Sequence, residues 1–226
     1  MKKFPRKLLT PKEARLFDRL NTPQKLQNFL NKLPQNFEEK GETCLSPRHI
    51  LKENKAHCIE GALFAAAILW YHGKRPMVMH LITKNHDYDH VVAIFKDGNR
   101  YGALSKTNHA VLRYRDPVYK TPRELAMSYF NEYFMDGTGE KTMLGFTKPI
   151  DLEKIAGTKW LWGGKNLWDI NDKLFHTRHQ SVAPNRILRK LRPADAIEIR
   201  VMDVPEQKKP TTNDLRRKTT KRLAKK

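Results

Sequence analysis

The chain has 226 residues, with 44 lysines and arginines against 24 aspartates and glutamates, so its formal net charge is +20. This length suits one domain with an ordinary hydrophobic core. Two cysteines are too few for a disulfide framework, and the longest apolar stretch, residues 62–69, is too short to span a bilayer. Charged residues and proline interrupt any apolar run behind the basic N-terminus, which is not typical of a secretory signal. We therefore expect a cytoplasmic protein with free thiols and no membrane partner.

Part of the positive charge lies at the C-terminal end. Residues 205–226 contain nine lysines and arginines against two acidic residues, with almost no apolar side chains. Such a segment cannot bury enough apolar surface to fold, so we expect a disordered basic tail over 205–226 and a single domain over 1–204. The tail would attract polyanions, which makes nucleic acid or a ribosome a candidate partner.

Threonine or serine followed by proline marks the starts of the first helices. These pairs begin at Thr10, Thr22, Ser46 and Thr121, and two of them continue into capping boxes. Apolar residues at helical spacing predict two short helices before residue 34 and a longer helix over 122–134. Three further helical segments are expected in the last third of the chain, at 151–156, 166–175 and 187–191.

The middle of the chain predicts a central helix followed by strands. The apolar run over 58–71 ends before Gly73 and is expected to be a buried helix. Strands are predicted over 76–83, 90–96 and 100–105, the last two joined by an Asp97-Gly98 turn, with further strands at 110–114 and 197–202. The predicted fold class is α+β: a small antiparallel sheet packed on one side against the central helix, with additional N- and C-terminal helices.

The predicted central helix begins with a cysteine, and the second predicted strand begins with a histidine. Cys58 is the first residue of the predicted helix, where free backbone N–H groups lower a thiol pKa and can hold an oxyanion. His90 opens the second strand, where its ring could take the proton of the thiol. This order of residues favours a cysteine nucleophile.

Residues 56–105 resemble the transglutaminase-like cysteine fold, a papain-related superfamily. The resemblance rests on Cys58 at a helix start, Gly73 fifteen residues later, a following strand, and the His90-Val91-Val92 strand. It implies a single transglutaminase-like domain with a helical N-terminal extension, Cys58 as nucleophile and His90 as its base. It also implies attack on an amide or peptide bond, without a cofactor.

The chain departs from the family pattern at the residue that orients the histidine. If Asp97-Gly98 is a two-residue turn, counting outward sets His90 opposite Ser105, where the family carries aspartate. Serine can fix the tautomer of the ring but brings no charge, and in a serine protease a neutral replacement costs about 10⁴ in kcat. Asn108 could replace it, as asparagine does in papain-like enzymes. The remaining candidates are Asp116, Asp87 and Asp89.

Two other groups of residues have a functional and a structural interpretation. Arg113, Arg115 and Asp116 could bind a carboxylate or phosphate of a substrate, or the arginines could pair internally with Asp116 or Glu60. Three tryptophans between residues 160 and 168 could stack on a ligand or fill the core.

The histidines near Cys58 do not predict a metal site. The spacings among residues 57, 58, 80, 86 and 90 match no closed zinc pattern, so we expect no metal.

The predicted function is a thiol-dependent hydrolase or acyl transferase acting on a peptide or amide substrate. The alternative is a catalytically degenerate basic protein that binds nucleic acid or a ribosome.

Overall fold

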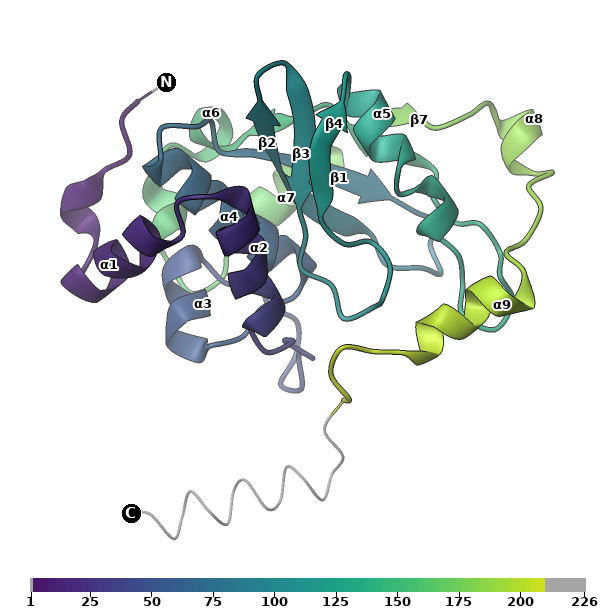
Figure 1. Cartoon of the computed structure of the whole chain (residues 1–226), viewed down its shortest axis with the longest axis horizontal. Helices are drawn as coiled ribbons and strands as arrows, with labels where there is room; N and C mark the ends of the chain where they lie inside the picture. The colour runs from purple at the N-terminus through teal and green to yellow at the C-terminus, as the bar shows by residue number, and fades with distance from the viewer. Residues whose placement is uncertain (1, 210–226) are drawn as a thin grey trace, which may run out of the picture.

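The computed structural model describes residues 2–209, which form an α+β fold with an antiparallel sheet and several helices (Figure 1). Among these residues the sheet has seven strands in the order β4-β3-β2-β1-β5-β7, with β6 also paired to β1. Every pairing is antiparallel, as the sequence predicted. The strands are β1 (Met77–Ile82), β2 (His90–Asp97), β3 (Arg100–Leu104), β4 (Arg115–Tyr119), β5 (Gly145–Thr147), β6 (Ile150–Asp151) and β7 (His179–Ser181).

The helices of the first half gather on one side of the sheet in Figure 1. They are α1 (Pro11–Arg19), α2 (Pro23–Lys32), α3 (Pro47–Glu53) and α4 (Cys58–Tyr71), with a 3₁₀ turn at Arg6–Leu8. The later helices are α5 (Pro122–Met127), α6 (Leu152–Ala156), α7 (Trp168–His176), α8 (Asn185–Leu188) and α9 (Ala196–Ile199). Further 3₁₀ turns lie at Phe130–Glu132, Lys159–Leu161 and Arg200–Asp203.

Helix α4 is the centre of the larger hydrophobic core. Every residue of α4 after Cys58 is buried, because helices and sheet surround it. Its alanines allow the backbone to approach the sheet closely, and it packs with Val91, Ala93 and Phe95 of β2. The predicted buried helix is therefore confirmed, with the predicted bounds.

The sheet is covered on both faces, so the expectation of helices on one side was wrong. Val92 and Ile94 alternate with the α4-facing residues of β2 and belong to a second core with Leu125 of α5, Tyr129 and Phe146. The physical reason is that β1 and β2 are apolar at both odd and even positions, and a strand with this pattern needs cover on both sides.

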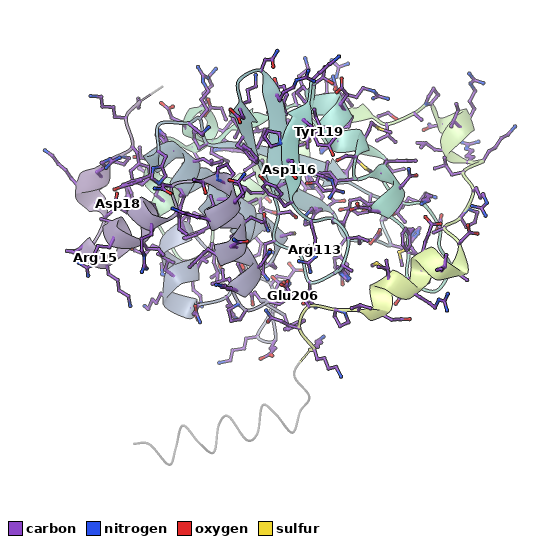
Figure 2. All side chains as sticks on the ribbon, in the orientation of Figure 1. Arg15, Asp18, Arg113, Asp116, Tyr119 and Glu206 are labelled. Atoms are coloured by element: carbon purple, nitrogen blue, oxygen red, sulfur yellow. The ribbon has the colours of Figure 1, made fainter. Side chains whose placement is uncertain are left out.

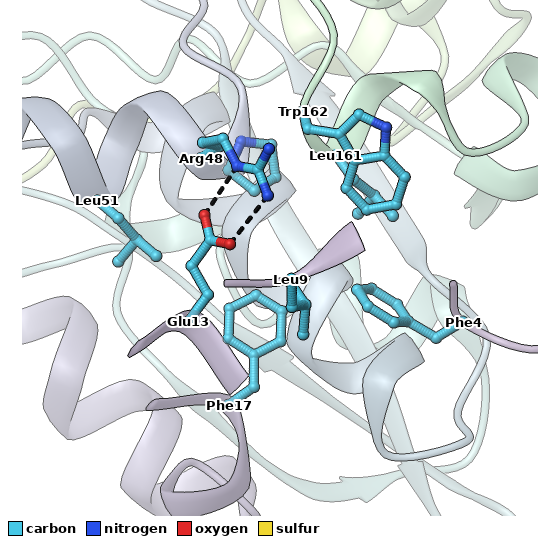
Figure 3. Close-up of a pocket in the computed structure, with 9 residues that line it drawn as sticks. Phe4, Leu9, Glu13, Phe17, Arg48, Leu51, Leu161 and Trp162 are labelled. Atoms are coloured by element: carbon cyan, nitrogen blue, oxygen red, sulfur yellow. Dashed lines mark hydrogen bonds and ion pairs between the residues drawn. The ribbon is translucent and has the colours of Figure 1, made fainter. Parts of the chain in front are cut away.

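The N-terminal helices are attached to α3 by an ion pair. Arg48 donates from Nε and Nη2 to both carboxylate oxygens of Glu13, at 2.8 and 2.9 Å (Figure 3). The gap beside this pair, walled by Phe4, Phe17 and Trp162, has a volume of only about 10 Å³. It can hold about one water at most, so it is a packing gap and not a ligand site.

Three element predictions were wrong. Residues 110–114 form a loop in which Leu112 has a positive φ of 59°, and the strand begins only at Arg115. Asp116 and Tyr119 lie on that strand in Figure 2. The helix from residue 122 ends at Met127, where the Ser128 hydroxyl donates back to the Leu125 carbonyl. The last predicted strand is helical, because Asp195 caps α9 with Glu198 in a capping box that the sequence analysis overlooked.

The tryptophans do not form one platform. Trp160 is buried and stacks on Trp70 of α4 with ring centroids 6.2 Å apart, and Trp162 packs edge-on against Phe4. Trp168 is 40 % exposed at the start of α7.

Within residues 2–209, no helix combines the length and the apolar composition needed to cross a bilayer.

Gly61 tests the close packing of α4. A Cβ at Gly61 would lie 2.4 Å from the Cβ of Lys106, so Gly61→Ala overpacks the helix. We expect a net loss of about 1–2 kcal/mol in the free energy of unfolding, since overpacking costs about 1–3 kcal/mol and alanine recovers up to about 1 kcal/mol of helix propensity. Urea denaturation measures it. Gly164→Ala, which meets only one atom at 3.9 Å, is the control and should change stability little.

Candidate functional site

A cleft with a volume of about 1100 Å³ opens where α4 and β2 both begin. Four parts of the chain form its walls: the loop around residues 35–43, the segment 82–91, the loop 106–112, and α7 with β7. Cys58, His57 and His90 lie on its wall. The size is in the range of small-molecule and peptide sites.

Cys58 lies between two imidazoles at the N-terminus of α4. Its Sγ is 3.9 Å from His57 Nδ1, and the ring of His90 lies near enough to lower the pKa of the thiol. The carbonyl oxygen of Asp89 lies 3.9 Å from the same sulfur. Cys58 is only partly buried, so the sulfur remains accessible from the cleft.

The hydrogen bonds of Ser105 fix the tautomer of His90. The Ser105 hydroxyl lies 2.8 Å from His90 Nε2 and donates its only proton to the Leu112 carbonyl, at 2.5 Å. Ser105 must therefore accept a hydrogen bond from Nε2–H of the ring. His90 Nδ1 is left to face the sulfur as the proton acceptor.

Buried Glu60 holds His57 in place. The Glu60 carboxylate is fully buried and accepts hydrogen bonds from the backbone N–H of His57 at 2.9 Å and from the side chain of Thr43 at 2.7 Å. Asn36 Nδ2 and the Leu45 N–H donate to it as well. His57 Nε2 lies 3.0 Å from the Thr43 carbonyl and 3.5 Å from Glu60 Oε1. These contacts set the ring so that Nδ1 faces the sulfur.

The surroundings of Cys58 and His57 shift the pKa values of both groups. Burial raises the pKa of the Cys58 thiol, but hydrogen bonds from His57 and His90 and the positive charge of both rings outweigh it and lower the pKa to about 5. Burial lowers the pKa of His57, but its hydrogen bond to Cys58 and the negative charges of Cys58 and Glu60 raise it to about 10. At neutral pH the site therefore holds a thiolate beside an imidazolium.

The second cysteine has the opposite environment. Cys44 is fully buried, and burial together with the nearby Glu60 carboxylate raises the pKa of its thiol to about 12. Neither cysteine forms a disulfide. Only Cys58 therefore has the properties of a nucleophile.

The structure brings Cys58, His90 and Ser105 together, but it places Asn108 elsewhere. The Asn108 amide donates to the Gln207 carbonyl and accepts from the Gln207 N–H, both at 2.9 Å. It is therefore committed to the C-terminal segment and does not orient His90. Residues 206 and 207, which fall in the expected tail 205–226, therefore contact the domain, while residues 210–226 lie outside the described residues.

The three predicted substrate-binding residues do not form one group. Arg115 pairs with Glu132 at 2.6 Å and lies over the Tyr129 ring, which gives it a structural role. Asp116 is exposed on β4. Arg113 alone lies next to the cleft, because its Nη2 is 3.6 Å from Glu206 Oε2 beside Lys106.

The other carboxylates considered for His90 serve different partners. Asp89 accepts from His80 Nε2 at 3.0 Å and from the Thr83 N–H at 2.8 Å, and His179 Nε2 lies 3.1 Å from His80 Nδ1. Asp87 accepts from the Thr142 hydroxyl. The side chains of Asp89, His80 and His179 therefore form a hydrogen-bonded series along the cleft wall, which meets the Cys58 group only at the backbone carbonyl of Asp89.

Sequence reasoning did not assign His57 and Glu60 to the site. The available signal was their spacing: a residue before the first helical position followed three residues later by glutamate is the pattern of a helix cap. That pattern predicts the Glu60 contact to the His57 N–H. It does not predict that loop 36–45 would close over the carboxylate.

Comparison with known proteins gives no further guide to the site. A scan against models of protein families finds no match, and a search of curated proteins finds no significantly similar chain.

Alkylation with iodoacetamide tests the contrast between the two thiols. Because the thiolate is the reacting species, the rate at Cys58 should rise through pH 5 and stay nearly level from pH 6.5 to 8. Cys44 should remain unlabelled throughout this range in the folded protein. Peptide mapping by mass spectrometry measures both. Equal and slow labelling of the two cysteines would contradict the assignment.

His57→Gln tests the source of the low pKa. Removing the imidazolium should raise the pKa of Cys58 from about 5, and a rise of about two units would slow alkylation at pH 6 roughly tenfold, because most of the thiolate would then be protonated. His176→Gln, which changes an exposed histidine on α7, is the matched control and should leave the rate unchanged. An unaltered pH profile in His57→Gln would show that this ring does not hold the thiolate.

Proposed function

We propose that the protein is a thiol-dependent hydrolase or acyl transferase of the transglutaminase-like type, acting on amide or peptide bonds. The observation that supports this most is the position of the Cys58 sulfur, at a helix N-terminus between two imidazoles in an open cleft. Buried structural cysteines lack these features, as Cys44 illustrates.

In the proposed acylation step the Cys58 thiolate attacks a carbonyl carbon and forms a C–S bond. The carbonyl oxygen becomes negative and accepts a hydrogen bond from the Cys58 N–H, which a first helical residue leaves without an intrahelical partner. His90, protonated at Nδ1 by the proton that the thiol gave up, passes it to the departing nitrogen as the C–N bond breaks.

The second step returns the site to its starting state. Neutral His90 takes a proton from a water or an amine, which attacks the thioester, and the Cys58 thiolate leaves as the C–S bond breaks. Water as the attacking group gives hydrolysis, and an amine gives acyl transfer. Ser105 accepts from His90 Nε2–H in both steps and so keeps Nδ1 aimed at the sulfur.

His57 supplies a charge to the site, which the neutral Ser105 does not. In the resembled family an aspartate stabilises the imidazolium, whereas here a cation stabilises the thiolate directly. With a pKa of about 10, His57 keeps its proton at neutral pH while the sulfur is a thiolate and acts as a fixed charge beside it. Buried Glu60 compensates that charge.

The competing function is a catalytically degenerate protein that binds nucleic acid or a ribosome. The net charge of +20 favours it, and so does Ser105 at the place of the family's aspartate. It does not account for a sulfur with a pKa of about 5 on the wall of a cleft.

Acylation by p-nitrophenyl acetate tests the proposal. We expect a burst of nitrophenolate equal to one equivalent of protein, with an acetyl group found on Cys58 by mass spectrometry. Cys58→Ala should abolish the burst, whereas Cys44→Ala should retain it. His90→Ala should slow turnover roughly 10²- to 10⁴-fold, the usual contribution of a general acid–base group.

Ser105→Ala should have a smaller effect than His90→Ala. It removes one neutral hydrogen bond of about 1 kcal/mol, which corresponds to about a fivefold loss of rate. Acetylation that persists in Cys58→Ala at the wild-type rate would refute the proposed nucleophile.

A further inference from the structure

Lys106 is a buried cation on the wall of the candidate site. It directly follows Ser105, and its side chain runs past Gly61, one turn after Cys58 in α4. The side chain is only 1 % exposed, yet its Nζ has no hydrogen-bond partner among the described residues. Lys106 also lines the cleft that holds Cys58.

A buried ammonium without a hydrogen-bonded partner costs several kcal/mol, so its persistence calls for an anion. The nearest carboxylate oxygen is Glu206 Oε2, at 3.8 Å from Lys106 Nζ and 3.6 Å from Arg113 Nη2. Both distances exceed those of a charge-assisted hydrogen bond, which is about 2.7–2.9 Å. Glu206 therefore balances the charge of the two cations without satisfying their donors.

Glu206 reaches this position because the C-terminal segment crosses the rim of the cleft. The Glu206 N–H donates to the Asn108 carbonyl at 2.8 Å, and Gln207 exchanges two hydrogen bonds with the Asn108 side chain. The Gln35 N–H donates to Gln207 Oε1 at 2.8 Å. Figure 2 shows Glu206 below Arg113, where the segment returns from α9.

These contacts resemble those of a bound peptide. Residues 206 and 207 use their backbone on Asn108, while one carboxylate lies between the cations of Lys106 and Arg113. The neighbouring Gln35 and Asn108 also line the cleft. The segment therefore occupies a place that a peptide substrate could take.

We propose that Lys106 and Arg113 form a subsite for a carboxylate group of the substrate, and that Glu206 of the same chain occupies it in the resting state. This proposal rests on the proposed function only in placing the subsite beside Cys58. Binding of a carboxylate does not itself require turnover. Either an acidic side chain or the C-terminal carboxylate of a peptide supplies this group. Burial and the adjacent Arg113 lower the pKa of Lys106, and the charge of Glu206 opposes this shift.

Fluorescence polarisation with labelled tripeptides on full-length Cys58→Ala protein tests the subsite without catalysis. The first pair of probes is Gly-Gly-Glu amide and Gly-Gly-Gln amide, and the second is Gly-Gly-Gly with a free or an amidated C-terminus. With Glu206→Gln added to open the subsite, the charged member of at least one pair should bind about tenfold tighter than its neutral partner. The pair that responds identifies the source of the carboxylate.

Two further variants connect the preference to these residues. Each is made in the Glu206→Gln protein. Lys106→Met, which keeps a side chain of similar length, should remove most of the tenfold preference, and so should Arg113→Gln. Lys52→Met, which removes an exposed lysine of α3, is the control and should preserve it. With Glu206 intact the preference should be smaller, because the resident carboxylate competes.

Equal binding of charged and neutral peptides to the Glu206→Gln protein would overturn the proposal. So would a preference that survives both Lys106→Met and Arg113→Gln. Thermal melting shows whether Lys106→Met folds, and Arg113→Gln, at a partly exposed residue, supplies the second test if it does not. A carboxylate preference without a nitrophenolate burst would retain the subsite and reject the catalytic function.

Discussion

The buried carboxylate of Glu60 is the constraint on which the candidate site depends. An unpaired carboxylate in this position would cost several kcal/mol, so three donors of one loop and the His57 N–H must converge on it. Their convergence closes the loop around residues 36–45 over the start of α4. The same carboxylate faces the ring of His57, whose other nitrogen is directed at the sulfur. Folding of the helix N-terminus and preparation of the thiolate therefore use one set of contacts.

This arrangement separates two tasks that one charged dyad usually performs. Stabilising the thiolate requires a cation that keeps its proton at neutral pH, which the surroundings of His57 provide. Moving a proton requires a ring with one nitrogen free, which Ser105 ensures for His90 by accepting from the other nitrogen. A neutral serine is sufficient for the second task, since no fixed negative charge is needed to select a tautomer. In the proposed mechanism, serine in place of the resembled family's aspartate is therefore less costly than it would be in a site with a single histidine.

The sequence predicted much of this framework because its signals are local. The predicted pairing of His90 with Ser105 was two residues out of register, since the turn residues are Gly98 and Asn99 and Ser105 falls opposite Val92. An even shift keeps side chains on the same face, so the hydroxyl still reaches the ring diagonally. The environment of Glu60 could not be predicted in this way, because its donors come from a polar loop without periodicity. Likewise, the covered second face of the sheet depends on α5 and β5, which are distant in sequence.

The C-terminal segment shows why composition alone misplaces a boundary. Its lysines and lack of apolar residues predict that it has no core of its own. Composition does not show that one carboxylate in it can be held by cations that the domain has buried. Glu206 is one of two acidic residues among the last 22, and it pairs with Lys106 and Arg113. Charge complementarity with the cleft, and not burial of apolar surface, therefore brings this part of the chain back to the domain.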